Sequence, residues 1–240
     1  MYPVSNIDFG TNVSLLASHQ FIPRVKVCGI TSVEDALVAV ETGADAIGLV
    51  FYPPSPRYVS TDIAKKISLA VGPFITVVGL FVNESKANID NILRSVGLHV
   101  LQFHGDEPPS FCDAFHRPYM KAIRMKADIN IEQVIESYPN ASGILLDAYR
   151  KGVPGGTGET FDWNRVPARQ SLQQPAQQSD KQGLPPIILA GGLTPNNIAA
   201  AVATTRPYGV DVSGGVEVSP GKKDPQKVAD FIKNAKSIIY

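Results

Sequence analysis

The chain has 240 residues with 22 acidic and 22 basic side chains, so its formal net charge is zero. A neutral chain without a basic run gives no reason to expect nucleic acid or an anionic membrane as a partner. Its two cysteines, Cys28 and Cys112, imply no disulfide framework and suit a reducing compartment. The first residues lack the pattern of a signal peptide or a membrane span, so a cytoplasmic protein is expected.

Short apolar runs, rich in β-branched residues, recur along the chain. They lie at residues 25–29, 46–51, 76–82, 100–104, 119–125, 143–148, 186–191 and 209–214. Nearly continuous apolar runs of this length are typical of parallel strands that are buried on both faces. The sequence therefore predicts eight such strands.

Helix-start signals separate several of these strands. Thr31 with Glu34 spells a T-x-x-E capping box, and both Thr194-Pro195 and Asp224-Pro225 place a capping residue before a proline. Eight strand–helix units predict an α/β fold, a closed (β/α)8 TIM barrel with eight parallel strands. A doubly wound sheet needs fewer strands, and no G-x-G-x-x-G fingerprint follows the first strand.

Two segments fall outside the repeat. Residues 1–24 are expected to form an N-terminal extension, followed by a single barrel domain over residues 25–240. Residues 168–183 contain six glutamines and almost no apolar side chains. Such a stretch cannot bury enough surface to offset its ordering entropy, which predicts a loose surface insertion.

Polar side chains gather where the predicted strands end, and in a TIM barrel those carboxyl ends form the active site. The residues at these ends are Cys28, Asn83, His104, Asp147 and Asp211. Cys28 could pack as a small hydrophobic residue or react as a thiolate. Asp147 could cap a backbone amide, or it could be an acid whose pKa is raised by burial. The residue types leave both questions open.

Two further polar residues have structural alternatives of their own. Arg57 follows three prolines in a stiff loop and could pair with a substrate carboxylate, or it could be an ordinary surface arginine. His104 is more often a structural histidine than a catalyst. No second His, Cys or carboxylate stands at metal-ligand spacing in the sequence, so no metal site is predicted.

Two glycine-containing loops predict a phosphate site. Gly191 and Gly192 follow the seventh strand, and Ser213, Gly214 and Gly215 follow the eighth. Glycines let backbone N–H groups approach an anion, and barrels often bind phosphate with the loops after these two strands. The alternative is that the glycines only make tight turns. Residues 155–163 lack the lysine of a P-loop and are predicted to form a loop that closes over substrate.

These segments together resemble the phosphoribosylanthranilate isomerase family. The resemblance rests on KVCGIT, GLVFYPPSPRYVS, GLFVN, LQFHGDE, LLDA, GGTGETFDW, AGGLTPNN and VDVSGGVEVSPGKKD, which follow the family's order. It extends from about residue 25 to residue 236. The long leader and these loops look more like fungal members than bacterial ones.

The resemblance implies an isomerase of tryptophan biosynthesis. It would convert N-(5-phosphoribosyl)anthranilate, by an Amadori rearrangement without a cofactor, into 1-(2-carboxyphenylamino)-1-deoxyribulose 5-phosphate. By the same resemblance Asp147 is the general acid and Cys28 the general base. The implied binding residues are Arg57, Asp211 and His104 for the anthranilate and pocket, and Gly191, Gly192, Ser213, Gly214 and Gly215 for the phosphate.

Other functions stay open as alternatives. Indole-glycerol-phosphate synthase would present lysine and glutamate at the mouth, and a pentose-phosphate epimerase would present paired aspartates with a histidine-bound metal. Cys28 with Asp147 fits neither. A non-catalytic barrel that binds a phosphorylated ligand is possible, because a fold does not imply catalysis. A monomer is expected, or one domain of a multifunctional tryptophan-pathway polypeptide.

Overall fold

The computed structural model describes residues 21–148, 160–167 and 185–238. Most of the expected N-terminal extension, the insertion at 168–183 and nearly all of the loop at 149–160 lie outside the described residues. The first strand begins at Arg24, which pairs with Gly209, so the barrel includes one residue of the expected extension.

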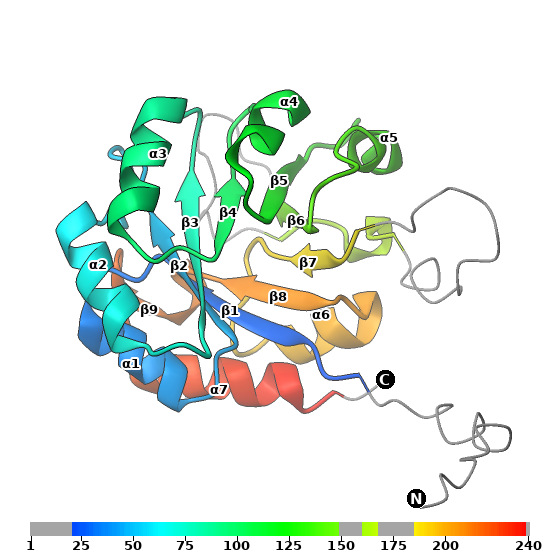
Figure 1. The fold of residues 1–240 in the computed structure, drawn as a ribbon. Coiled ribbons are helices and arrows are strands. Elements are labelled where there is room, and N and C mark those ends of the chain that lie inside the picture. Colours follow the sequence, from blue (N-terminus) through cyan, green and yellow to red (C-terminus); the bar gives the residue numbers. More distant parts are fainter. Residues whose placement is uncertain (1–20, 149–159, 168–184, 239–240) are drawn as a thin grey trace, which may run out of the picture.

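Eight parallel strands form a closed barrel, which confirms the predicted fold. The strands are β1 (Arg24–Cys28), β2 (Ala46–Val50), β3 (Thr76–Phe81), β4 (Val100–Phe103), β5 (Tyr119–Met125), β6 (Gly143–Ala148), β7 (Ile187–Leu189) and β8 (Gly209–Val212). Each strand pairs with the next in the chain, and β8 pairs with β1 to close the ring. Figure 1 shows the strands surrounded by the helices.

The connections after the strands carry the helices and a small hairpin. The helices are α1 (Val33–Glu41), α2 (Thr61–Ala70), α3 (Lys86–Ser95), α4 (Pro109–Cys112), α5 (Ile131–Glu136), α6 (Ile198–Thr205) and α7 (Pro225–Lys236). Short 3-10 turns are η2 (Asp113–Phe115), η3 (Trp163–Arg165) and η5 (Gly214–Val216), and the hairpin is β9 (Glu217–Ser219) with β10 (Lys222–Lys223). After β5 the helix α5 has only six residues, and after β6 the described residues hold only η3.

Helix starts follow the sequence signals in only one of three cases. Asp224 caps α7 as expected, accepting hydrogen bonds from the amides of Gln226 and Lys227. The capping box at Thr31 was wrong by one residue, because Ser32 caps α1 while the Thr31 hydroxyl donates to the Gly221 carbonyl at 2.6 Å. Helix α6 starts at Ile198 rather than at Pro195.

The apolar core lies mainly between the strands and the helices. One large cluster there joins strand residues such as Phe81 and Phe103 to helix residues such as Phe231. Inside the barrel the apolar clusters are small, and buried polar side chains accompany them. The strands were readable from the sequence because both of their faces are buried.

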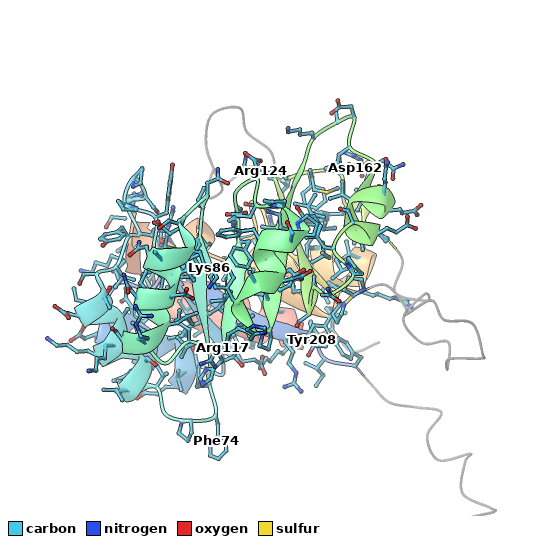
Figure 2. All side chains as sticks on the ribbon, turned by 45° about the horizontal axis from the view of Figure 1, so that its top comes forward. Phe74, Lys86, Arg117, Arg124, Asp162 and Tyr208 are labelled. Atoms are coloured by element: carbon cyan, nitrogen blue, oxygen red, sulfur yellow. The ribbon has the colours of Figure 1, made fainter. Side chains whose placement is uncertain are left out.

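The two rims of the barrel lie on opposite sides of the molecule. Figure 2 shows Arg124, near the carboxyl end of β5, on the opposite side of the molecule from Phe74, which precedes β3. Phe74 is 96% exposed, whereas the Arg124 guanidinium donates to the backbone carbonyl of His104 at 3.0 Å. At the other rim Arg24 pairs with Asp45 at 2.9 Å, so polar contacts occur at both rims.

The cap of α7 can be tested alone. We expect Asp224→Ala to lower the free energy of unfolding by about 1 kcal/mol, because two helix amides lose their acceptor. Asp224→Asn, which keeps an acceptor oxygen, should lose much less. Urea unfolding measures both variants. A loss below about 0.3 kcal/mol for the alanine variant would show that Pro225, not the carboxylate, defines the helix start.

Candidate active site

A cavity opens at the carboxyl ends of the strands. Its volume is about 530 Å³, which is within the range of pockets that bind small molecules. The structure brings to this cavity all ten residues that were predicted for the site: Cys28, Arg57, His104, Asp147, Gly191, Gly192, Asp211, Ser213, Gly214 and Gly215. It also places there Gln102 and Tyr52, which the sequence analysis did not single out.

Cys28 lies beside a buried ion pair. Lys26 is two residues before Cys28 on β1, so both side chains leave the strand on the same face. The Lys26 Nζ is 2.7 Å from Asp211 Oδ1, and both side chains are buried. A Cβ placed on Gly48 of β2 would lie 2.6 Å from the Cys28 Sγ and 3.1 Å from the Lys26 Cε. Only glycine at this position leaves room for the thiol and the ammonium group together.

Opposing effects act on the proton of this thiol. Burial raises the pKa of Cys28, and the carboxylate of Asp211 raises it further, whereas Lys26 and Lys223 lower it. Burial is the largest effect on Lys26 and opposes its charge, but Asp211 and Cys28 together outweigh it and raise the pKa of this ammonium. Lys26 is therefore the main group that favours the thiolate of Cys28, whereas burial is the largest effect that favours the thiol.

Asp147 belongs to a chain of three polar side chains. The Nε2 atom of His104 is 3.1 Å from Asp147 Oδ2, and its Nδ1 atom is 3.1 Å from the amide nitrogen of Gln102. All three side chains are buried and line the cavity. Asp147 therefore does not cap a neighbouring backbone amide in the described residues. It lies at the cavity with an imidazole as its hydrogen-bond partner.

Arg57 is held by a carboxylate of this protein. Its Nε and Nη2 atoms bond to the two oxygens of Glu217 at 2.8 and 2.9 Å. Lys223 also contacts Glu217, with 2.8 Å between Nζ and Oε1. These two cations lower the pKa of Glu217 against the opposing effect of burial, which is the largest single contribution. The guanidinium lines the cavity in a fixed orientation rather than as a mobile surface arginine.

The two glycine loops pack closely against their neighbours. Gly191 and Gly192 have φ angles of +79° and +63°, a region that favours glycine. A Cβ on Gly215 would lie 1.9 Å from the Leu193 carbonyl oxygen, so the loops after β7 and β8 are in backbone contact. The Ser213 Oγ is buried at the cavity and has no hydrogen-bond partner among the described residues. An unpartnered hydroxyl beside glycine amides is suited to binding an anion.

Two other polar or reactive residues have structural roles. Asn83, which was expected at the barrel mouth, does not line the cavity. Its backbone N–H donates to Glu107, which is paired with Lys121 at 2.7 Å. The thiol of Cys112 is buried in α4, and burial raises its pKa to about 12. Asn83 and Cys112 are therefore part of the structure that follows β3 and β4, and not of the cavity.

The sequence analysis missed Lys26, Gln102 and Glu217. Lys26 and Gln102 each stand two residues before a predicted site residue, so strand alternation was a usable signal for them. Glu217 is 160 positions from Arg57 in the sequence, and no spacing rule connects the two. Across residues 21–148, 160–167 and 185–238, no helix is long and apolar enough to cross a membrane, and no three His, Cys or carboxylate residues form a metal-binding group.

Comparisons with known proteins agree on one family. The family model of N-(5′-phosphoribosyl)anthranilate (PRA) isomerase matches residues 25–234. The N-(5′-phosphoribosyl)anthranilate isomerase of Pseudomonas fluorescens (strain Pf0-1) is 56% identical over 210 residues, which are 87% of this chain and 96% of the relative. The enzyme of the same name from Cellvibrio japonicus is 53% identical over 209 residues, which are 87% and 91% of the two chains. These relatives are bacterial, so the expected fungal-like character is corrected.

Solved structures are similar as well. The crystal structure of phosphoribosyl anthranilate isomerase from Thermotoga maritima has a TM-score of 0.78 and 40% identity, and covers 90% of this chain and 100% of that chain. A second structure of the isomerase, in complex with reduced 1-(o-carboxyphenylamino)-1-deoxyribulose 5-phosphate, has a TM-score of 0.74 at 40% identity over the same shares.

The effect of Lys26 on the Cys28 thiol can be measured by alkylation with iodoacetamide. The raised pKa of Cys28 predicts a rate that still increases above pH 9.0, the ordinary value of a thiol. We expect Lys26→Met to slow the reaction at about pH 8 by roughly tenfold, because the cation that favours the thiolate is lost.

Cys28→Ser supplies the control, since any remaining reaction then belongs to Cys112, whose pKa of about 12 makes it slower. Circular dichroism verifies that the variants are folded. An unchanged or faster rate in folded Lys26→Met would contradict the electrostatic role of Lys26.

Proposed function

Because the chain belongs to the N-(5′-phosphoribosyl)anthranilate isomerase family, it is an isomerase of tryptophan biosynthesis, and we propose that Asp147 and Cys28 are its general acid and general base. The reaction converts N-(5′-phosphoribosyl)anthranilate into 1-(2-carboxyphenylamino)-1-deoxyribulose 5-phosphate. The observation that carries the assignment is that one carboxyl group and one thiol reach the same cavity from β6 and β1.

The first step requires an acid. Asp147 gives its proton to the furanose ring oxygen, the bond between that oxygen and C1 breaks, and the nitrogen lone pair forms the C1–N double bond of an iminium. The carboxylate left behind keeps the hydrogen bond to His104 Nε2 at 3.1 Å. Stabilisation of the conjugate base in place is what an acid catalyst needs at the moment of transfer.

The second step requires a base. Cys28 acts as the thiolate and takes the proton from C2 to become the thiol, the electron pair moves to form the C1–C2 double bond, and the iminium nitrogen becomes neutral. The enolamine then gains a proton at C1 and loses its C2 hydroxyl proton, which gives the ketone. Burial of Cys28 favours the thiol, so the base depends on the nearby charge of Lys26 and on the acidity that the iminium gives to C2.

The remaining predicted residues are proposed to hold the substrate. The phosphate would lie on Gly191, Gly192 and Gly214, Gly215, with the hydroxyl of Ser213 donating to it. Arg57 would offer the rest of its guanidinium to the anthranilate carboxylate while Glu217 holds its Nε edge. Asp211 would face the anthranilate moiety together with Arg57, and His104 lines the pocket.

The cellular setting belongs to the same proposal. We infer a cytoplasmic enzyme that acts as a monomer, with a single barrel domain over residues 25–240. The first relatives align over 91 to 96% of their own length, which supports an enzyme of this size. A multifunctional tryptophan-pathway polypeptide remains the alternative. Light scattering of the purified full chain distinguishes a monomer from a dimer.

Turnover of freshly made N-(5′-phosphoribosyl)anthranilate tests the acid and the base. We expect Cys28→Ser and Asp147→Asn each to reduce kcat by about 10²- to 10⁴-fold, because each removes one proton transfer. Loss of substrate fluorescence follows the reaction. Binding of the reduced product analogue, measured by calorimetry, should persist in both variants.

The outcomes separate the parts of the proposal. Full turnover in one folded variant would overturn the role of that residue alone. No turnover by the unmodified protein would favour a barrel that binds a phosphorylated ligand without reaction.

The phosphate site has its own test in Ser213→Ala. We expect KM to rise by roughly tenfold or more, because a hydrogen bond to a charged group is lost, while kcat changes little. The free energy of unfolding should not fall, since this hydroxyl makes no hydrogen bond in the described structure. Ser95→Ala on the exposed face of α3 is the matched control. An unchanged KM would remove Ser213 from the phosphate site.

A further inference from the structure

Gln102 is a buried polar residue that neither the sequence analysis nor the two proton transfers account for. It lies on β4 with no exposed surface, two residues before His104, so the two side chains leave the strand on the same face. Its amide nitrogen is 3.1 Å from His104 Nδ1, and its carbonyl oxygen has no partner among the described residues. A buried amide that is only half satisfied is costly to keep, which points to a role at the cavity.

The amide nitrogen determines which imidazole nitrogen carries the proton. An amide NH2 group can only donate a hydrogen bond, so His104 Nδ1 must accept and cannot itself be protonated. The neutral imidazole then has its proton on Nε2. That N–H donates to Asp147 Oδ2 across the 3.1 Å contact.

The same reasoning fixes the proton of the acid. Asp147 Oδ2 accepts a hydrogen bond from His104, so in the acid form that the proposed function requires it is the carbonyl oxygen of the carboxyl group. The acid proton then resides on Oδ1, which has no hydrogen bond to a described side chain or amide and is free to meet a ligand in the cavity. An imidazolium would carry a proton on Nδ1 as well, so it could not accept the hydrogen bond from Gln102.

We propose that Gln102 is a positioning residue for the isomerisation, which holds His104 as the neutral tautomer protonated at Nε2 and so directs the acid proton of Asp147 onto Oδ1. The inference rests on the proposed role of Asp147 as general acid. The charged groups around the imidazole are Asp147 on β6 and Arg124 on β5, with Arg57 and Asp211 also lining the cavity. Arg124 bonds to the backbone carbonyl of His104, not to its ring.

Nitrogen NMR of protein labelled with 15N-histidine reads the tautomer directly. We expect the His104 ring to show a protonated Nε2 and an unprotonated Nδ1. His99 is an internal reference, because its Nδ1 accepts the backbone N–H of Val77 at 2.9 Å and the residue lies outside the cavity. A His104 ring that is protonated at Nδ1 in the unmodified protein would overturn the inference.

Two variants test the consequence for catalysis. Gln102→Glu puts an acceptor opposite Nδ1, so the proton should move to Nδ1, and kcat should fall by about 10²- to 10⁴-fold, as for a wrong tautomer in other enzymes. Gln102→Met has a similar length without a donor, leaves both tautomers accessible, and should lose only about tenfold. KM should change little in either variant, and His99 signals should not move.

The outcomes distinguish this inference from the proposed function. A folded Gln102→Glu variant with an inverted His104 and full turnover would overturn the positioning role. If that variant does not fold, the NMR signals of the unmodified protein and the turnover of Gln102→Met decide the matter. Full turnover by Asp147→Asn would refute the acid assignment while the tautomer measurement stands independently.

Discussion

The seam at which β8 pairs with β1 is the constraint on which the rest of the site depends. Lys26 and Asp211 are direct partners across this seam, and their side chains form the buried ion pair. A shift of the register by one residue would turn Lys26 and Cys28 out of the barrel interior. It would also leave one charge without its partner, which costs several kcal/mol for a buried group. The strand pairing that closes the barrel therefore also places the Cys28 thiol in its interior.

Buried charges at this rim occur in pairs, and the pairs join segments that are distant in sequence. Glu107 with Lys121 ties the loop after β4 to β5, and Glu217 with Lys223 and Arg57 ties the hairpin after β8 to the loop after β2. Such pairs contribute little net stability, because desolvation offsets their attraction. Their effect is on geometry, because each ion pair holds its side chains in one orientation. Ser213 Oγ and Gln102 Oε1 at the cavity have no partner among the described residues, so they are available to a ligand in addition to Asp147 and Arg57.

The sequence predicted the barrel because its strands are apolar on both faces, and it placed the strand-end residues at the mouth because parallel strands share one carboxyl rim. Its errors have local causes. Thr31 could not cap α1, since its hydroxyl is engaged by Gly221, 190 positions away. Lys26 and Gln102 share a strand face with Cys28 and His104, a signal that a reading of the strand ends alone does not use, and Glu217 acts on Arg57 only after the fold has formed. Contacts of that kind are decided by tertiary structure, not by spacing.

Gly48 contributes to the site by having no side chain. It is the direct partner of Cys28 in the pairing of β1 with β2, and the volume that a side chain would fill there is shared by the thiol and the Lys26 stem. The thiol and the lysine therefore come from β1, and the space that they occupy is left by the glycine on β2. Anyone who transplants a cysteine base into another barrel would have to transfer this empty position together with the reactive residue.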